Sequence, residues 1–119
     1  MNNFSNLCSI HINTTRNNTI LTATNSEGKV LATKTAGLVL KSKRGKRSVP
    51  QGALLSGESL GSFLLERGFL TSIVKVKGFG GGRENALQGL ITSGLDIIQI
   101  VDITAHPHNG CRPRKARRI

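Results

Sequence analysis

The glycine-rich stretch from Lys77 to Arg83, Lys-Gly-Phe-Gly-Gly-Gly-Arg, contains the residue types that most often hold a phosphate group. It follows a short apolar run and precedes a helical pattern, and glycines in such a turn let backbone amides approach an anion. Lys77 and Arg83 flank the turn and add positive charge. The chemistry that this stretch indicates is therefore binding of a phosphate, either in a nucleotide or in a nucleic-acid backbone.

Neither common nucleotide-binding pattern is complete in this stretch. Arg83 stands where the dinucleotide pattern requires its last glycine, and no lysine followed by serine or threonine forms a phosphate loop. What is left is a phosphate contact without catalysis, made by Lys77, Gly80, Gly82 and Arg83. The alternative is a tight turn that needs glycine only for its backbone angles.

Two short segments hold most of the positive charge. The 119 residues include 17 Lys and Arg against 6 Asp and Glu, for a formal net charge of +11. Clustered charge indicates a polyanionic partner, with a solvated face and a transport signal as alternatives. Nucleic acid fits better than an acidic membrane, because neither segment has an apolar face. The cations are Lys41, Lys43, Arg44, Lys46 and Arg47 in one segment, and Arg112, Arg114, Lys115, Arg117 and Arg118 in the other.

The sequence has few of the residues that metal-dependent catalysis requires. A two-metal nuclease needs several carboxylates that converge on ions about 4 Å apart, and the first strand-like run has no acid. We expect Asp102 to be a partner for a lysine or a backbone amide. Glu84 is expected to lie in the first turn of a helix, where its negative charge is favourable. The sequence thus predicts no catalytic residue, no metal site and no cofactor.

The two cysteines are expected to be free thiols. Cys8 and Cys111 lie at opposite ends of a chain without an export signal or a long apolar run, which indicates a soluble intracellular protein. A disulfide between them is the alternative. Together with His106 and His108 they match no common zinc spacing, and the segment His-Pro-His-Asn-Gly predicts a bend that aims the last residues away from the preceding strand.

The elements that position these residues follow from the spacing of apolar side chains. In the first helical segment Ala53, Leu60 and Leu64 share one face, but several glycines weaken it, so packing must hold it. In the second, Leu87, Leu90 and Ile91 are expected to face the core. The expected strands are 9–15, 19–24, 29–36, 72–77 and 97–103, and the expected helices run from 48 or 50 to 68 and from 83 or 84 to 93.

This order predicts an α/β fold with a mixed sheet of the ribonuclease-H-like type. Three antiparallel strands are followed by helix, strand, helix and strand, whose alternation implies parallel pairing with right-handed crossovers. We expect one domain over residues 1–107 with a basic loop at 38–48, and a basic RNA-binding tail over 108–119. The same fold raises the alternative of a metal-dependent nuclease, which the missing carboxylate cluster disfavours.

Four stretches carry a resemblance to a known family. They are residues 11–22, 32–37, 76–84 and 102–118, the last reading Asp-Ile-Thr-Ala-His-Pro-His-Asn-Gly-Cys-Arg-Pro-Arg-Lys-Ala-Arg-Arg. In order and spacing they resemble small-subunit ribosomal protein S11 over nearly the whole chain. The resemblance implies a non-enzymatic ribosomal component on the platform of the small subunit, bound to ribosomal RNA near the messenger RNA exit path, with S18 and S7 as protein neighbours.

By position, the resemblance also implies where RNA is contacted. The places are the turn after the first strand, the basic loop, the glycine turn and the tail. Together with the phosphate contact inferred above, the expected RNA-binding residues are Arg16, Asn17, Asn18, Lys41, Lys43, Arg44, Lys46, Arg47, Lys77, Gly80, Gly82, Arg83, His108, Asn109, Gly110, Arg112, Arg114, Lys115, Arg117 and Arg118.

The chain also departs from the family pattern. Bacterial members carry a basic arm before the first strand, whereas this chain has a short, uncharged lead rich in asparagine. Phe79 and Gly81 stand where the family usually has prolines. These departures indicate an organelle version, and we expect a mitochondrial ribosome, with the bacterial cytoplasm as the alternative.

Overall fold

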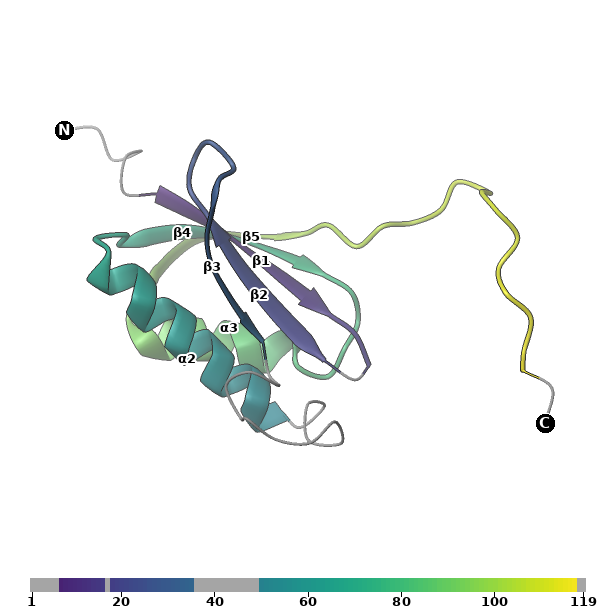
Figure 1. The fold of residues 1–119 in the computed structure, drawn as a ribbon, viewed down its shortest axis with the longest axis horizontal. Helices are drawn as coiled ribbons and strands as arrows, with labels where there is room; N and C mark the ends of the chain where they lie inside the picture. The colour runs from purple at the N-terminus through teal and green to yellow at the C-terminus, as the bar shows by residue number, and fades with distance from the viewer. Residues whose placement is uncertain (1–6, 17, 36–49, 118–119) are drawn as a thin grey trace.

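The computed structural model describes residues 7–16, 18–35 and 50–117. They form one five-stranded sheet with two helices packed on one of its faces (Figure 1). The α/β fold class and the predicted order of elements are confirmed. The elements are β1 (Leu7–Thr14), β2 (Thr19–Thr24), β3 (Val30–Thr35), α2 (Pro50–Glu66), β4 (Thr71–Lys77), α3 (Arg83–Ser93) and β5 (Asp96–Asp102).

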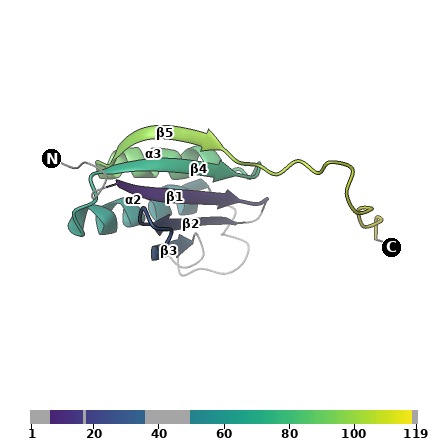
Figure 2. The same ribbon diagram turned by 90° about the horizontal axis from the view of Figure 1, so that it is seen from above.

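The sheet is mixed, as the sequence predicts. Its strand order is β3-β2-β1-β4-β5, in which β1 pairs antiparallel with β2 and parallel with β4. Strand β2 pairs antiparallel with β3, and β4 pairs parallel with β5. Figure 2 looks onto the face that carries no helix, with the strands in front of α2 and α3.

The core lies between the sheet and the helices. Alternate residues of the central strands point toward it, so that Ile10, Ile12 and Val74 are fully buried. Leu60 and Leu64 of α2 pack against them, as their spacing predicts. Only one face of each strand is buried in this way, which leaves the second face of the sheet for other uses.

The two helices touch through their backbones. A Cβ added to Gly57 of α2 would lie 2.5 Å from the carbonyl oxygen of Ala86 and 3.1 Å from the Cα of Gly89 in α3. A Cβ on Gly89 would collide with the carbonyl oxygen of Leu54. Glycine therefore weakens α2 as a helix but lets α3 approach it, which confirms that packing holds α2.

The predicted core face of α3 is partly wrong. Leu90 is buried and Leu87 packs partly against the core, but Ile91 is 54% exposed. The buried residues of α3 are Ala86, Gly89 and Leu90. The contact with α2 uses the small residues, so the helix is rotated toward them and Ile91 is left at its side.

Candidate nucleic-acid interface

Several basic segments of the chain leave the sheet at one end. Strands β1, β3, β4 and β5 all run in the same direction, because β1 and β3 are both antiparallel to β2 and β1, β4 and β5 are parallel. Asn13 pairs with Lys77 and Ile20 pairs with Thr35, so these strands finish close to the same level. We call this edge the carboxyl end of the sheet. The predicted basic loop follows Thr35, and its own residues lie outside the described ranges.

The turn between β1 and β2 presents Arg16 at the carboxyl end. The amide of Thr15 donates to the carbonyl oxygen of Asn18 at 2.9 Å, and the amide of Thr19 donates to Asn18 Oδ1 at 2.9 Å. Asn18 therefore uses its side-chain oxygen to close the turn, while Arg16 is exposed. Asn17 lies outside the described residues. RNA contact by this turn stays a prediction.

The glycine turn is fastened to the neighbouring strands by threonine hydroxyls. Thr14 Oγ1 donates to the carbonyl oxygen of Lys77 at 3.1 Å and accepts from the amide of Gly80 at 3.1 Å. The amide of Gly78 donates to Thr104 Oγ1 at 3.1 Å. Gly78 has φ +95°, where a side chain would be strained, and a Cβ there would collide with the carbonyl oxygen of Thr14.

These bonds change what the turn can offer to an anion. The amides of Gly78 and Gly80 donate inside the protein, so a phosphate at this turn would have to use other donors. Gly82 is buried, and a Cβ there would collide with the side chain of Thr19. Close packing and the angles of the turn thus explain these glycines, which favours the tight-turn interpretation. RNA contact at Gly80 and Gly82 stays a prediction.

Arg83 forms an ion pair with the end of β5. Its Nη2 lies 2.9 Å from Asp102 Oδ2, and its Nη1 donates to the carbonyl oxygen of Gly78 at 3.1 Å. Asp102 Oδ1 also accepts from the hydroxyl of Thr104 at 2.7 Å and from its amide at 3.0 Å. The hydroxyl and amide of Thr104, and then Arg83, hold the pKa of the Asp102 carboxyl well below its usual range.

The expected partner of Asp102 is therefore correct in one part and wrong in the other. A backbone amide does bind it, but the cation is Arg83 and not a lysine. The reason is geometric, since the first residue of α3 lies beside the last residue of β5. The charge of Arg83 is offset by Asp102, whereas Lys77 is exposed and forms no ion pair in the described part of the chain.

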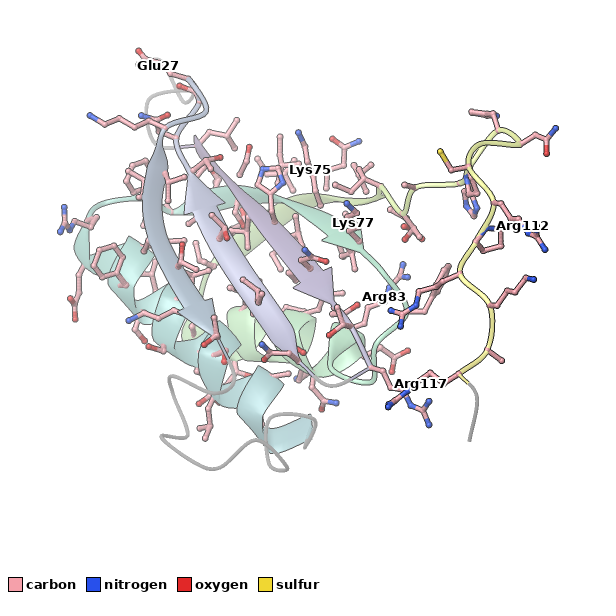
Figure 3. The ribbon with its side chains drawn as sticks, turned by 45° about the vertical axis from the view of Figure 1, so that its right-hand side comes forward. Glu27, Lys75, Lys77, Arg83, Arg112 and Arg117 are labelled. Carbon is pink, nitrogen blue, oxygen red and sulfur yellow. The ribbon has the colours of Figure 1, made fainter. Side chains whose placement is uncertain are left out.

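The tail leaves the end of β5 and extends away from the sheet (Figure 1). Residues 105–117 are all exposed, and no hydrogen bond or ion pair of the described residues involves them. Asn109 has φ +60°, which produces the bend predicted there. Figure 3 shows Arg112 and Arg117 on this segment, which contains no helix or strand. RNA contact by the tail stays a prediction. Of the tail residues expected to contact RNA, the structure describes His108, Asn109, Gly110, Arg112, Arg114, Lys115 and Arg117, whereas Arg118 lies outside the described residues.

The described residues do not build a metal centre. Among residues 7–16, 18–35 and 50–117, no three His, Cys, Asp or Glu side chains are grouped so that they could hold an ion. Cys8 is buried and Cys111 exposed, both as free thiols, and burial raises the pKa of Cys8 to about 11. None of the described helices is long and apolar enough to cross a membrane.

Two surface features were missed by the sequence reasoning. On the face without helices, the register of β1 and β4 places His11 beside Lys75. The period-two pattern of these strands could have shown that both residues share a face, but not that they are neighbours. At the outer edge, Ile98 and Ile100 of β5 are 62% and 55% exposed and line a groove with Ile91. No periodicity could reveal the second feature, because it depends on β5 being the edge strand.

Comparisons of the sequence with known proteins identify one family. The sequence model of the family described as ribosomal protein S11 matches residues 8–118. The chain is 46% identical over 110 residues to the small ribosomal subunit protein uS11c of Tupiella akineta, covering 92% of this chain and 84% of that protein. It is 40% identical over 109 residues to uS11 of Methylobacterium radiotolerans and 41% identical over 109 residues to uS11 of Nitrobacter hamburgensis, covering 92% of this chain and 84% and 83% of those proteins.

Proposed function

The chain belongs to the ribosomal protein S11 family, and from this membership we propose that it binds small-subunit ribosomal RNA on the platform of the subunit, near the messenger RNA exit path. As a member of this family it is a structural, non-enzymatic constituent of the small ribosomal subunit and takes part in translation. The proposal concerns how it is held there.

One observation carries the proposed mode of binding. The Arg16 turn, the glycine turn with Lys77, and the start of the tail all lie at the carboxyl end of the sheet, although they are far apart in sequence. The acidic turn residue Glu27 lies at the opposite end, as Figure 3 shows. Positive groups that converge on one end of a globule form a single electrostatic footprint for a polyanion.

The tail is the part of the chain that gains most from RNA. Its side chains are exposed on all sides and make no hydrogen bond within the described protein. An RNA surface supplies phosphates for Arg112, Arg114, Lys115 and Arg117, so the ordering of this segment is coupled to binding. If about eight phosphates are engaged in total, affinity falls roughly a thousandfold or more between 50 and 200 mM salt.

The protein neighbours are part of the proposal as well. The groove that Ile91, Ile98 and Ile100 line at the β5 edge supports a protein contact, because exposed apolar side chains and an unpaired edge strand favour protein association. Platform proteins such as S18 and S7 are the neighbours that we expect.

We also propose which kind of ribosome contains this protein. The relatives named above are a chloroplast protein and bacterial proteins. We favour an organelle ribosome, and specifically a mitochondrial one, on the residues Phe79 and Gly81 in the glycine turn. Sedimentation of the protein with small subunits from purified mitochondria tests it, and recovery only with cytoplasmic bacterial subunits contradicts it.

RNA binding is tested by removing the tail charges. A variant truncated after Gly110 is compared with the full chain in filter binding to a bacterial small-subunit ribosomal RNA transcript at several salt concentrations. We expect weaker binding and a shallower salt dependence. The melting temperature should stay close to that of the full chain, because the described tail residues are exposed and make no hydrogen bond or ion pair. Equal affinity for the two proteins contradicts the proposal.

A further inference from the structure

The face of the sheet opposite the helices, which we call the open face, is mainly polar, and its single acid, Asp96, lies at the amino end of the edge strand β5. The strand registers place its residues, since paired residues point to the same side of a sheet. The other five acids lie in the β2–β3 turn, in the helices, or on the helix side of β5 at Asp102, and Asp96 pairs with Thr71, four residues before Lys75. The strand registers place on the open face Leu7, Ser9, His11, Asn13, Ile20, Thr22, Thr24, Val30, Thr33, Thr35, Thr71, Ile73, Lys75, Lys77, Asp96, Gln99 and Val101.

Hydrogen-bonding side chains lie in rows across this face. His11 pairs with Thr22 of β2 on one side and with Lys75 of β4 on the other, so three polar groups sit on adjacent strands about 4.8 Å apart. One step along, Asn13 pairs with Lys77. The Cα atoms of Lys75 and Lys77 are about 7 Å apart along β4. Figure 3 shows both side chains on the side of the sheet away from the helices.

The two lysines of the open face have no acidic partner within the described residues. The single ion pair there joins Arg83 to Asp102. His11 faces Thr22 and Lys75 across the sheet, and no acid offsets the ammonium group; burial and then Lys75 lower the pKa of His11. Unpaired like charges side by side destabilise a sheet modestly. This arrangement is therefore unfavourable for the isolated protein and favourable once an anion covers it.

We propose that the open face binds the sugar-phosphate backbone of an RNA helix. Lys75 and Lys77 neutralise phosphates, and His11, Asn13 and Thr22 form hydrogen bonds with phosphate or ribose hydroxyl oxygens. This inference rests on the proposed function, because it extends the contact with the same class of partner from the carboxyl end, through Lys77, onto the open face.

The chemistry of the face selects an RNA helix over other occupants. It has no Phe, Tyr or Trp, and its one aromatic ring, that of His11, is half-buried between Thr22 and Lys75. Unpaired bases are usually held by stacking on aromatic rings, for which this face offers little surface. Its apolar members Leu7, Ile20, Ile73 and Val101 are half-buried, and Val30 is exposed by itself on the edge strand β3. The face therefore lacks the contiguous exposed apolar patch that a protein partner would cover. A hydroxyl-rich surface with two cations fits the wide, shallow minor groove of an RNA helix, which displays ribose hydroxyls between phosphates.

The first experiment removes one charge from the open face. Lys75→Gln is compared with Lys29→Gln, which removes an equal charge from the turn at the opposite end of the sheet, by filter binding to a bacterial small-subunit ribosomal RNA transcript. We expect Lys75→Gln to bind about three- to tenfold more weakly near 100 mM salt, with a slope of log K against log salt shallower by about 0.7 to 0.9. Lys29→Gln should match the wild type, and Lys75→Arg should restore affinity.

The outcomes separate this inference from the proposed function. If Lys75→Gln binds like Lys29→Gln while truncation after Gly110 still weakens binding, the open-face contact is wrong and the proposed function stands. If the full chain itself does not bind the transcript, both are wrong. Melting temperatures of Lys75→Gln and Lys75→Arg close to wild type show that the change acts on binding.

A second experiment maps what covers the face in the assembled subunit. In a Cys111→Ser background, an iron chelate is tethered to Thr22→Cys on the open face, or to Ser62→Cys on the exposed side of α2 as the control. Hydroxyl radicals from Thr22→Cys should cleave both strands of one ribosomal RNA helix, and the control should not cleave that helix. Cleavage of single-stranded RNA only, or cleavage of a neighbouring protein instead of RNA, overturns the inference.

Discussion

Replacing Thr14 by valine tests how the glycine turn is held in place. One buried hydroxyl donates to the carbonyl oxygen of Lys77 and accepts from the amide of Gly80, both at 3.1 Å, and Thr14 is 3% exposed. Valine keeps the shape of the side chain and removes both bonds. We expect a loss of roughly 2 to 4 kcal/mol, because one amide is left unsatisfied at about 1 to 3 kcal/mol and a second bond of about 1 kcal/mol is lost.

The assay is thermal unfolding followed by circular dichroism. For a domain of this size each kcal/mol lowers the melting temperature by about 4 °C, so Thr14→Val should melt on the order of 10 °C lower. Thr33→Val on the exposed side of β3, for which no side-chain hydrogen bond is found among the described residues, is the matched control and should melt within about 2 °C of wild type. A melting temperature for Thr14→Val equal to that of Thr33→Val would refute the reasoning that this hydroxyl anchors the turn.

Three further predictions concern packing and ionisation. Gly57→Ala should destabilise the protein by about 1 to 2 kcal/mol despite a better helix propensity, because its Cβ meets the backbone of α3; urea unfolding checks this, and Ser62→Ala on the exposed side of α2 should be neutral or slightly stabilising. Asp102 has a folded pKa depressed below its ordinary 3.8, so it contributes stability above that pH that is lost as the pH falls through the folded value; the difference in stability between wild type and Asp102→Asn should shrink below pH 4, and a difference independent of pH contradicts it. His11 has a folded pKa below its ordinary 6.5, so its effect on stability is constant above that value and becomes unfavourable as the pH falls through 6.5 toward the folded pKa; wild type should lose stability over this window relative to His11→Gln, and parallel pH profiles count against it.

The fold was largely predictable because its strands and helices carry clear periodicities. In β1, and in β4 from Val74 onward, apolar residues alternate with polar ones, and the buried positions Ile10, Ile12 and Val74 follow this alternation. In α3 the pattern failed at Ile91, since apolar spacing assumes that large side chains make the contact. Here Gly57 and Gly89 make it, and glycines carry no hydrophobic signal.

The site was predictable in its charges but not in its geometry. The tail and Lys77 could be identified as candidate nucleic-acid contacts from residue types alone. Both are exposed, as such a contact requires. The pairing of Arg83 with Asp102 could not, because it depends on where α3 begins relative to the end of β5. The anchoring of Gly80 by Thr14 joins residues 66 positions apart, and only the sheet register brings them together.

The most direct measurement of the central claim is sedimentation of small ribosomal subunits assembled with the full chain or with the chain truncated after Gly110. After a wash in moderate salt, the full chain should stay with the subunit, and the truncated chain should be released at a lower salt concentration because it has fewer phosphate contacts. Release of both proteins at the same salt concentration would contradict an attachment through the cationic tail.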